Sequence, residues 1–123
     1  MVKQSNIFVV YLAGPFRGNF FIKKYNIWRA KQYAKILWKA NVAVICPHTN
    51  SGFIDDKESD KFILPANIEI MLRCDAVLFM KRYNKSIGTC NEKKLAILNG
   101  LPTYYSIRAL LNDIKAINKM GYY

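Results

Sequence analysis

The sequence predicts an α/β domain in which a parallel β-sheet lies between two layers of helices. Short apolar runs rich in β-branched residues alternate along the chain with longer segments of helical periodicity. The runs are apolar throughout, as expected for strands that are buried on both faces. The chain has 123 residues, of which 52% are apolar, so we expect one domain spanning residues 1–123 with a single buried core.

The first half of the chain contains two predicted strands and the helix between them. Residues 7–13 form an apolar run that Gly14 and Pro15 end, and residues 42–46 form a second run, ended by Pro47. Residues 25–40 show the periodicity of an amphipathic helix. Its predicted inward-facing side chains are Ile27, Ala30, Ala34, Leu37 and Trp38, and a row of like charge (Lys31, Lys35 and Lys39) follows its flank.

The second half begins with a polar loop over residues 49–61, which is long for a plain connection. It contains the acidic residues Asp55, Asp56, Glu58 and Asp60. Pro65 suits the first turn of the next helix, whose predicted inward-facing residues are Ile68, Met71 and Leu72. Residues 76–80 form the third strand and residues 103–106 the fourth. The helix between them is ended by Gly100 and Pro102, and an amphipathic helix carrying Ile107, Leu110, Leu111, Ile114 and Ile117 closes the chain.

Composition excludes several classes of protein. No apolar run approaches the roughly 18 residues of a membrane span, and residues 1–6 lack the layout of a signal peptide. The three cysteines are odd in number and lack closely paired spacing, and with a single histidine they do not form a zinc-binding motif. We therefore expect a reduced, cytoplasmic protein that needs no metal or cofactor and has no membrane partner. The net charge of +11 favours anionic partners, but the basic residues are dispersed, and we interpret them as a solvated surface in preference to a nucleic-acid site.

The polar residues that could carry chemistry each follow a predicted strand. Arg17 comes after the first strand, His48 after the second, and Ser86 and Glu92 after the third. A doubly wound parallel sheet binds its ligand in a crevice at the carboxyl ends of its strands. These residues are therefore expected to meet at one edge of the sheet.

Residues 86–92 lead from a strand through a loop into a helix, a layout whose free backbone N–H groups bind anions such as phosphate. Glu92 would then face the same crevice. The alternative is an N-terminal capping box, in which Thr89 and Glu92 satisfy backbone N–H groups. Other residues are equally ambiguous alone: Arg17 could bind phosphate or solvent, and His48 could contact a ligand or be polar surface. Tyr11 could be a core residue, and Cys90 a packed thiol.

Several short motifs in order resemble one known family. Residues 11–18, Cys46-Pro-His48, Cys74-Asp-Ala76 and Ser86-x-Gly-Thr-x-x-Glu92 are similar to motifs of the nucleoside 2-deoxyribosyltransferase superfamily. Within it the chain resembles small deoxyribosyltransferase-like phage and bacterial proteins and the 2'-deoxynucleoside 5'-monophosphate N-hydrolases. The resemblance covers residues 7–106. It implies a flavodoxin-like or Rossmann-like three-layer sandwich with a parallel sheet of four to five strands.

The resemblance also implies roles for individual residues. Glu92 matches the nucleophile that attacks C1' of the sugar, and Tyr11 matches the phenol that orients this carboxylate. His48 matches a residue beside the base. The pocket for sugar and 5'-phosphate corresponds to Gly14, Pro15, Arg17, Ser86 and Gly88. A neutral Ser86 with Arg17 nearby favours a monophosphate over a free nucleoside.

Asn67 departs from the family pattern, because the N-hydrolases carry an aspartate that assists base departure at this position. An amide can hold a hydrogen bond but cannot deliver or take up a proton at pH 7. Either another acid (Asp60 or Glu69) substitutes, or the base leaves unaided, or the protein binds nucleotides without turning them over. The resemblance implies N-glycosidase or deoxyribosyltransferase activity on a nucleoside 5'-monophosphate, with a nucleotide-binding protein as the alternative. It also implies a homodimer or larger assembly, to which Tyr122 and Tyr123 could contribute, in the cytoplasm of a bacterium or of a phage host.

Overall fold

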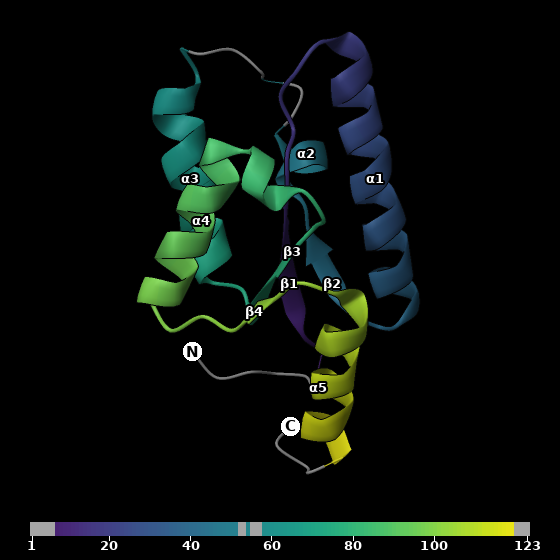
Figure 1. Cartoon of the computed structure of the whole chain (residues 1–123). Coiled ribbons are helices and arrows are strands. Elements are labelled where there is room, and N and C mark those ends of the chain that lie inside the picture. Colours follow the sequence, from purple (N-terminus) through teal and green to yellow (C-terminus); the bar gives the residue numbers. More distant parts are fainter. Residues whose placement is uncertain (1–6, 52–53, 55–57, 120–123) are drawn as a thin grey trace.

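A computed structural model of the protein describes residues 7–51, 54 and 58–119. Four parallel strands form one sheet in the order β2-β1-β3-β4 (Figure 1). They are β1 (Val9–Ala13), β2 (Ala43–Ile45), β3 (Ala76–Phe79) and β4 (Thr103–Tyr104). Val10 of β1 is paired with Val44 on one side and with Ala76 on the other. The predicted parallel, Rossmann-like α/β fold is confirmed.

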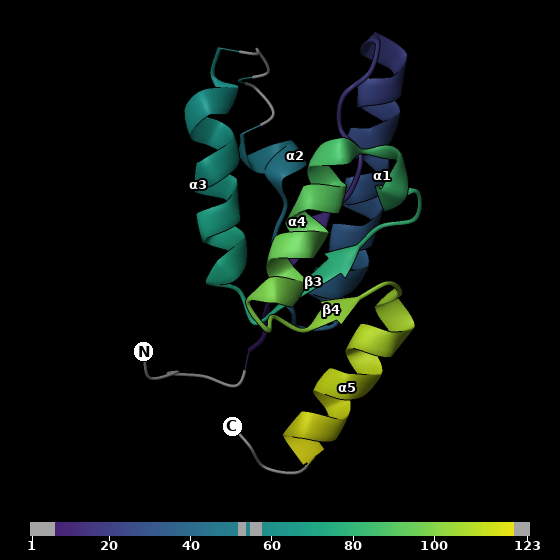
Figure 2. The ribbon, with the colours of Figure 1, turned by 60° about the vertical axis from the view of Figure 1, so that its left-hand side comes forward.

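Helices cover both faces of this sheet, as Figures 1 and 2 show together. One face is covered by α1 (Phe20–Lys39) and α5 (Ile107–Lys119), and the other by α3 (Asp60–Leu72) and α4 (Ile87–Leu98). Two short helices, α2 (Pro47–Asn50) and the 3₁₀ turn η1 (Tyr83–Lys85), lie at the carboxyl ends of β2 and β3. No helix among the described residues is long and apolar enough to cross a membrane.

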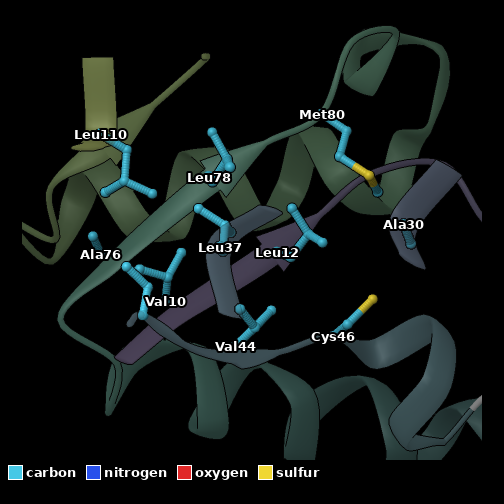
Figure 3. Packing of buried hydrophobic residues seen from close by; sticks show 11 residues of the cluster. Val10, Leu12, Ala30, Leu37, Val44, Cys46, Ala76, Leu78, Met80 and Leu110 are labelled. Carbon is cyan, nitrogen blue, oxygen red and sulfur yellow. The ribbon is translucent and has the colours of Figure 1, made fainter. Parts of the chain in front are cut away.

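Alternate residues of the central strands contribute to two separate cores, because successive side chains of a strand point to opposite faces. Val10 and Leu12 of β1 pack with Leu37 of α1 and Leu110 of α5 (Figure 3). Tyr11 and Ala13, one position along, pack instead with Met71 of α3 and other residues of the second core. Tyr11 is therefore on the α3 and α4 side of the sheet.

Helix α1 begins five residues before the predicted start. The Asn19 side chain caps it by accepting a hydrogen bond from the Ile22 backbone N–H at 2.9 Å. Its predicted inner face is confirmed at Ala30 and Leu37, which are fully buried, but the prediction was wrong for Trp38, which is 57% exposed. Trp38 lies in the last turn directly after the fully buried Leu37, and its side chain is on the solvent side of the helix.

Helix α3 corrects the prediction at Pro65. The helix begins at Asp60, so Pro65 lies inside it and not in its first turn. A proline there has no N–H to donate and crowds the carbonyl of residue 61, which weakens the helix locally. Met71 is buried and packs with Ile68 and Leu72 as predicted. The acidic residues Asp55 and Asp56, and Tyr122 and Tyr123, lie outside the described residues.

Candidate active site

A cavity of about 610 Å³ opens at the carboxyl edge of the sheet. Its walls are the loop after β1, the short helix α2, the first half of α3 and the N-terminal half of α4. The cavity lies outside the ends of β1 and β3, the two strands between which the strand order reverses. Doubly wound sheets bind ligands at this position. The predicted site residues that line the cavity are Gly14, Arg17, His48, Asn67, Ser86, Gly88 and Glu92.

The centre of the site is a hydrogen bond between Tyr11 and Glu92. The phenol of Tyr11, fully buried in β1, donates to Glu92 Oε2 at 2.6 Å. Glu92 lies in the second turn of α4 and lines the cavity. The two residues are 81 positions apart, so only the packing of α4 against the sheet brings them together.

This contact decides between the two interpretations of Glu92. The N-cap of α4 is Ser86, whose Oγ accepts a hydrogen bond from the Thr89 N–H at 3.2 Å. The capping box that Thr89 and Glu92 could have formed is therefore wrong. The Glu92 carboxylate reaches across to β1 and contributes to the cavity wall.

Burial raises the pKa of Glu92 from 4.5 to about 7, although the hydrogen bond from Tyr11 opposes this shift. Removing a carboxylate from water penalises its charged form, whereas a donor to it favours that form. The pKa of Tyr11 is raised, first by burial and then by the neighbouring Glu92, so the phenol remains the donor. A carboxylate with a pKa near neutrality, held by a fixed donor at a cavity wall, suits nucleophilic or acid–base chemistry.

The N-terminus of α4 provides backbone donors beside this carboxylate. Ser86, Ile87, Gly88 and Thr89 all line the cavity. The space over Gly88 is open: a Cβ atom there would meet only the Ser86 Oγ, at 3.9 Å. The Thr89 N–H already donates to Ser86 Oγ, but the N-terminus of a helix carries a partial positive charge, and with open space beside it this favours an anionic ligand.

Arg17 contacts a carboxylate across the cavity edge. Its Nη1 donates to Asp60 Oδ2 at 2.7 Å, and its Nη2 pairs with Asp60 Oδ1. Asp60, the first residue of α3, lines the cavity. Two acids, Asp60 and Glu69, could replace the aspartate that is missing at position 67. Asp60 lies at the cavity, whereas Glu69 pairs with Arg73 at 3.2 Å on the exposed face of α3.

His48 holds the loop that follows β1. Its Nε2 donates to the Pro15 carbonyl oxygen at 2.6 Å, and its ring meets the edge of Phe16 with 5.2 Å between ring centroids. Burial lowers the pKa of His48, so the ring is neutral. Its Nδ1 is buried and has no hydrogen-bond partner among the described residues. Pro15 itself does not line the cavity but supplies this carbonyl.

A side chain at Gly14 would crowd Met80, where the same loop passes the end of β3. A Cβ atom at Gly14 would lie 2.3 Å from Met80 Cε and 3.2 Å from Met80 Cβ. Asn26, a buried residue of α1 that was not predicted from the sequence, holds the same loop: its side chain donates to the Phe16 carbonyl at 3.2 Å. A polar residue on the inner face of an otherwise apolar helix was the available signal.

Comparison with known proteins supports the fold and identifies the family. A solved structure of the 2-deoxyribosyltransferase from the psychrotolerant bacterium Bacillus psychrosaccharolyticus has a TM-score of 0.58 and 21% sequence identity, covering 77% of this chain and 69% of that one. At this identity the likeness is one of fold. No curated protein matches the sequence. Residues 8–106 match the model of a family described as a domain of unknown function, DUF7768. Because this match spans most of the chain, the protein belongs to the DUF7768 family.

Proposed function

We propose that this protein cleaves or exchanges the N-glycosidic bond of a nucleoside 5'-monophosphate, with Glu92 as the nucleophile. The observation that carries the proposal is the hydrogen bond of 2.6 Å from Tyr11 to Glu92 at the cavity wall. A donor on one carboxylate oxygen fixes the side chain and leaves the other oxygen for attack. The fold of a 2-deoxyribosyltransferase is consistent with this chemistry.

The reaction consists of two displacements at C1' of the sugar. In the first, a Glu92 oxygen forms a bond to C1' while the bond from C1' to the base nitrogen breaks, and its electron pair leaves with the base. In the second, water or another base attacks C1' and releases the carboxylate. Two inversions give net retention. Water yields the free sugar phosphate, and a second base yields an exchanged nucleotide; in either case the attacking molecule gives up one proton, which balances the proton that the departed base takes up.

Two groups in the cavity wall favour a monophosphate over an uncharged nucleoside. Arg17 and the N-terminus of α4 line the same cavity as Glu92, and both interact favourably with phosphate. The predominantly apolar wall formed by Ile54, Ile63, Leu64, Ile68 and Leu95 suits a planar base.

The test is release of free base by the purified protein. Wild type and Glu92→Ala are incubated with a panel of deoxyribonucleoside and ribonucleoside 5'-monophosphates, with and without a second base, and products are separated by chromatography. We expect wild type to release base and Glu92→Ala to be slower by about a thousandfold or more, since a nucleophile is lost. Glu92→Gln keeps an acceptor for Tyr11 and serves as the matched control for packing. Equal turnover by Glu92→Ala would contradict the assignment.

A second candidate function is nucleotide binding without turnover, and Asn67 favours it. Asn67 lines the cavity but cannot protonate a departing base, and the nearby acid Asp60 is paired with Arg17. In that case no base appears with any protein, while a monophosphate still raises the melting temperature of wild type.

A further inference from the structure

The ion pair between Arg17 and Asp60 lies across the edge of the cavity. Arg17 comes from the loop after β1 and Asp60 from the first turn of α3, 43 positions later. Both side chains line the cavity. Both terminal nitrogens of the guanidinium are directed at the two oxygens of the same carboxylate. The pair therefore joins two walls of the cavity at its rim.

Water reaches both members of this pair. The side chain of Arg17 is 48% exposed and that of Asp60 is 22% exposed. Water and salt screen part of the energy of the pair, although the two parallel hydrogen bonds strengthen it. A ligand that enters the cavity thus meets a carboxylate already bound to the cation that it would contact.

A phosphate and a carboxylate use the guanidinium in the same way. Each presents two oxygens to the two parallel N–H groups of the fork. Asp60 already accepts from both terminal nitrogens of Arg17, so a ligand phosphate that uses these donors has to replace it. A phosphate monoester carries more charge at pH 7 than one carboxylate, and the N-terminus of α4 lines the same cavity.

We propose that Asp60 is a specificity-determining residue that occupies the anion-binding side of Arg17 until a ligand phosphate displaces it. This inference rests on the proposed function, in that the ligand is a nucleoside 5'-monophosphate. Displacement by a dianion is favourable, whereas an uncharged nucleoside leaves the Arg17–Asp60 pair intact. Asp60 thereby makes the phosphate a condition for engaging Arg17.

The experiment is calorimetric titration of four proteins with the four 2'-deoxynucleoside 5'-monophosphates and with the matching nucleosides. The proteins are wild type, Asp60→Asn, Arg17→Ala and the double variant. We expect Asp60→Asn to bind monophosphates about fivefold or more tightly than wild type, because the competing carboxylate is gone. Affinity for nucleosides should not change. In the Arg17→Ala background the gain from Asp60→Asn should disappear, because Asp60 acts through Arg17.

Glu69→Gln is the matched control. It changes the net charge by the same amount on the same helix, but Glu69 pairs with Arg73 away from the cavity. Its affinity for monophosphates should equal that of wild type. Equal or weaker binding by Asp60→Asn would overturn the proposal, since Asp60 would then orient Arg17. A gain that persists without Arg17 would overturn it as well, since long-range repulsion would explain it.

The outcomes also separate this inference from the proposed function. Failure of all proteins to bind any monophosphate overturns both. If wild type binds a monophosphate but releases no base, and Asp60→Asn still binds more tightly, the proposed catalysis fails and the role of Asp60 stands. Circular dichroism confirms that each variant is folded.

Discussion

At the scale of single residues, the site depends on how Tyr11 sets the ionisation of Glu92. Burial raises the pKa of Glu92 to about 7, and the hydrogen bond from Tyr11 opposes that shift. The two effects act on the charged form with opposite sign. The phenol therefore keeps more of the carboxylate ionised at neutral pH than burial alone would allow.

Tyr11→Phe should raise the pKa of Glu92 further, because it removes the donor and preserves the buried ring. We expect the ionisation midpoint to move upward by about one unit, which carbon-13 NMR of the Glu92 carboxyl group measures without any substrate. If the protein is an N-glycosidase, base release should rise with pH through the same midpoint, since only the carboxylate attacks. Tyr83→Phe changes a tyrosine that does not contact Glu92 and serves as the control. An unchanged or lower midpoint in Tyr11→Phe would contradict this account.

At the scale of elements, the ends of two helices, α1 and α4, are set by residues with left-handed backbone. Gly100 has φ of 71° and follows α4. The Leu101 N–H then donates to the Ala96 carbonyl at 2.9 Å, and the Gly100 N–H to the Ile97 carbonyl at 3.1 Å. These two bonds are those of a Schellman motif. Asn41, with φ of 65°, closes α1 in the same way.

Gly100→Ala should therefore destabilise the protein by about 1 kcal/mol, the cost of a left-handed backbone with a Cβ atom. Nothing lies within 4 Å of the added methyl group, so backbone strain is the whole effect. Urea unfolding measures it. Gly88→Ala, within α4 and also in open space, is the matched control and should be neutral or stabilising. Equal stability of Gly100→Ala and wild type would show that the backbone at the end of α4 relaxes without cost.

Local patterns predicted the elements well where one physical effect dominated. The strands are buried on both faces, so they form continuous apolar runs in the sequence, and their alternation with helices predicted the parallel sheet and the edge at which the cavity opens. The start of α1 was missed because one side chain, Asn19, caps it. Pro65 was predicted in a first turn because proline is favoured there. In the structure it lies inside α3, where packing of the helix face overrides the preference of proline for the first turn.

The contacts within the site were less predictable than its position. Tyr11 and Glu92 were expected to interact only through a family resemblance, since 81 positions separate them. The pairing of Arg17 with Asp60 leaves no local trace in the sequence. Such long-range contacts depend on how the helices pack against the sheet, and the periodicity of the sequence does not show this packing.

At the scale of the whole molecule, the cavity is bordered by apolar side chains that remain exposed. Ile87 at the start of α4 is 84% exposed, and Phe62 and Leu64 of α3 are 62% and 52% exposed. Ile87 and Leu64 line the cavity. Exposed apolar residues gathered around a functional opening are typical of surfaces that another chain covers.

We expect the protein to form a homodimer or larger assembly that covers this border. Light scattering should give at least twice the mass of the chain, and Phe62→Asp should reduce it by placing a charge in the contact. Ile97→Asp, which changes an apolar residue that is 56% exposed on α4 but does not line the cavity, is the control. A monomeric mass for wild type would contradict this expectation.

The separation of the two cores has a consequence for how such a chain tolerates mutation. Tyr11 packs in the core shared with α3 and α4, while Val10 and Leu12 on either side of it pack towards α1 and α5. Among the described residues, none from α1 or α5 lines the cavity. Apart from Asn26, which holds the Phe16 carbonyl of the cavity loop, substitutions can therefore accumulate in the layer of α1 and α5 under selection for stability, while the opposite layer keeps its chemistry. Divergence should be uneven across the sheet: fast on one face and slow on the other.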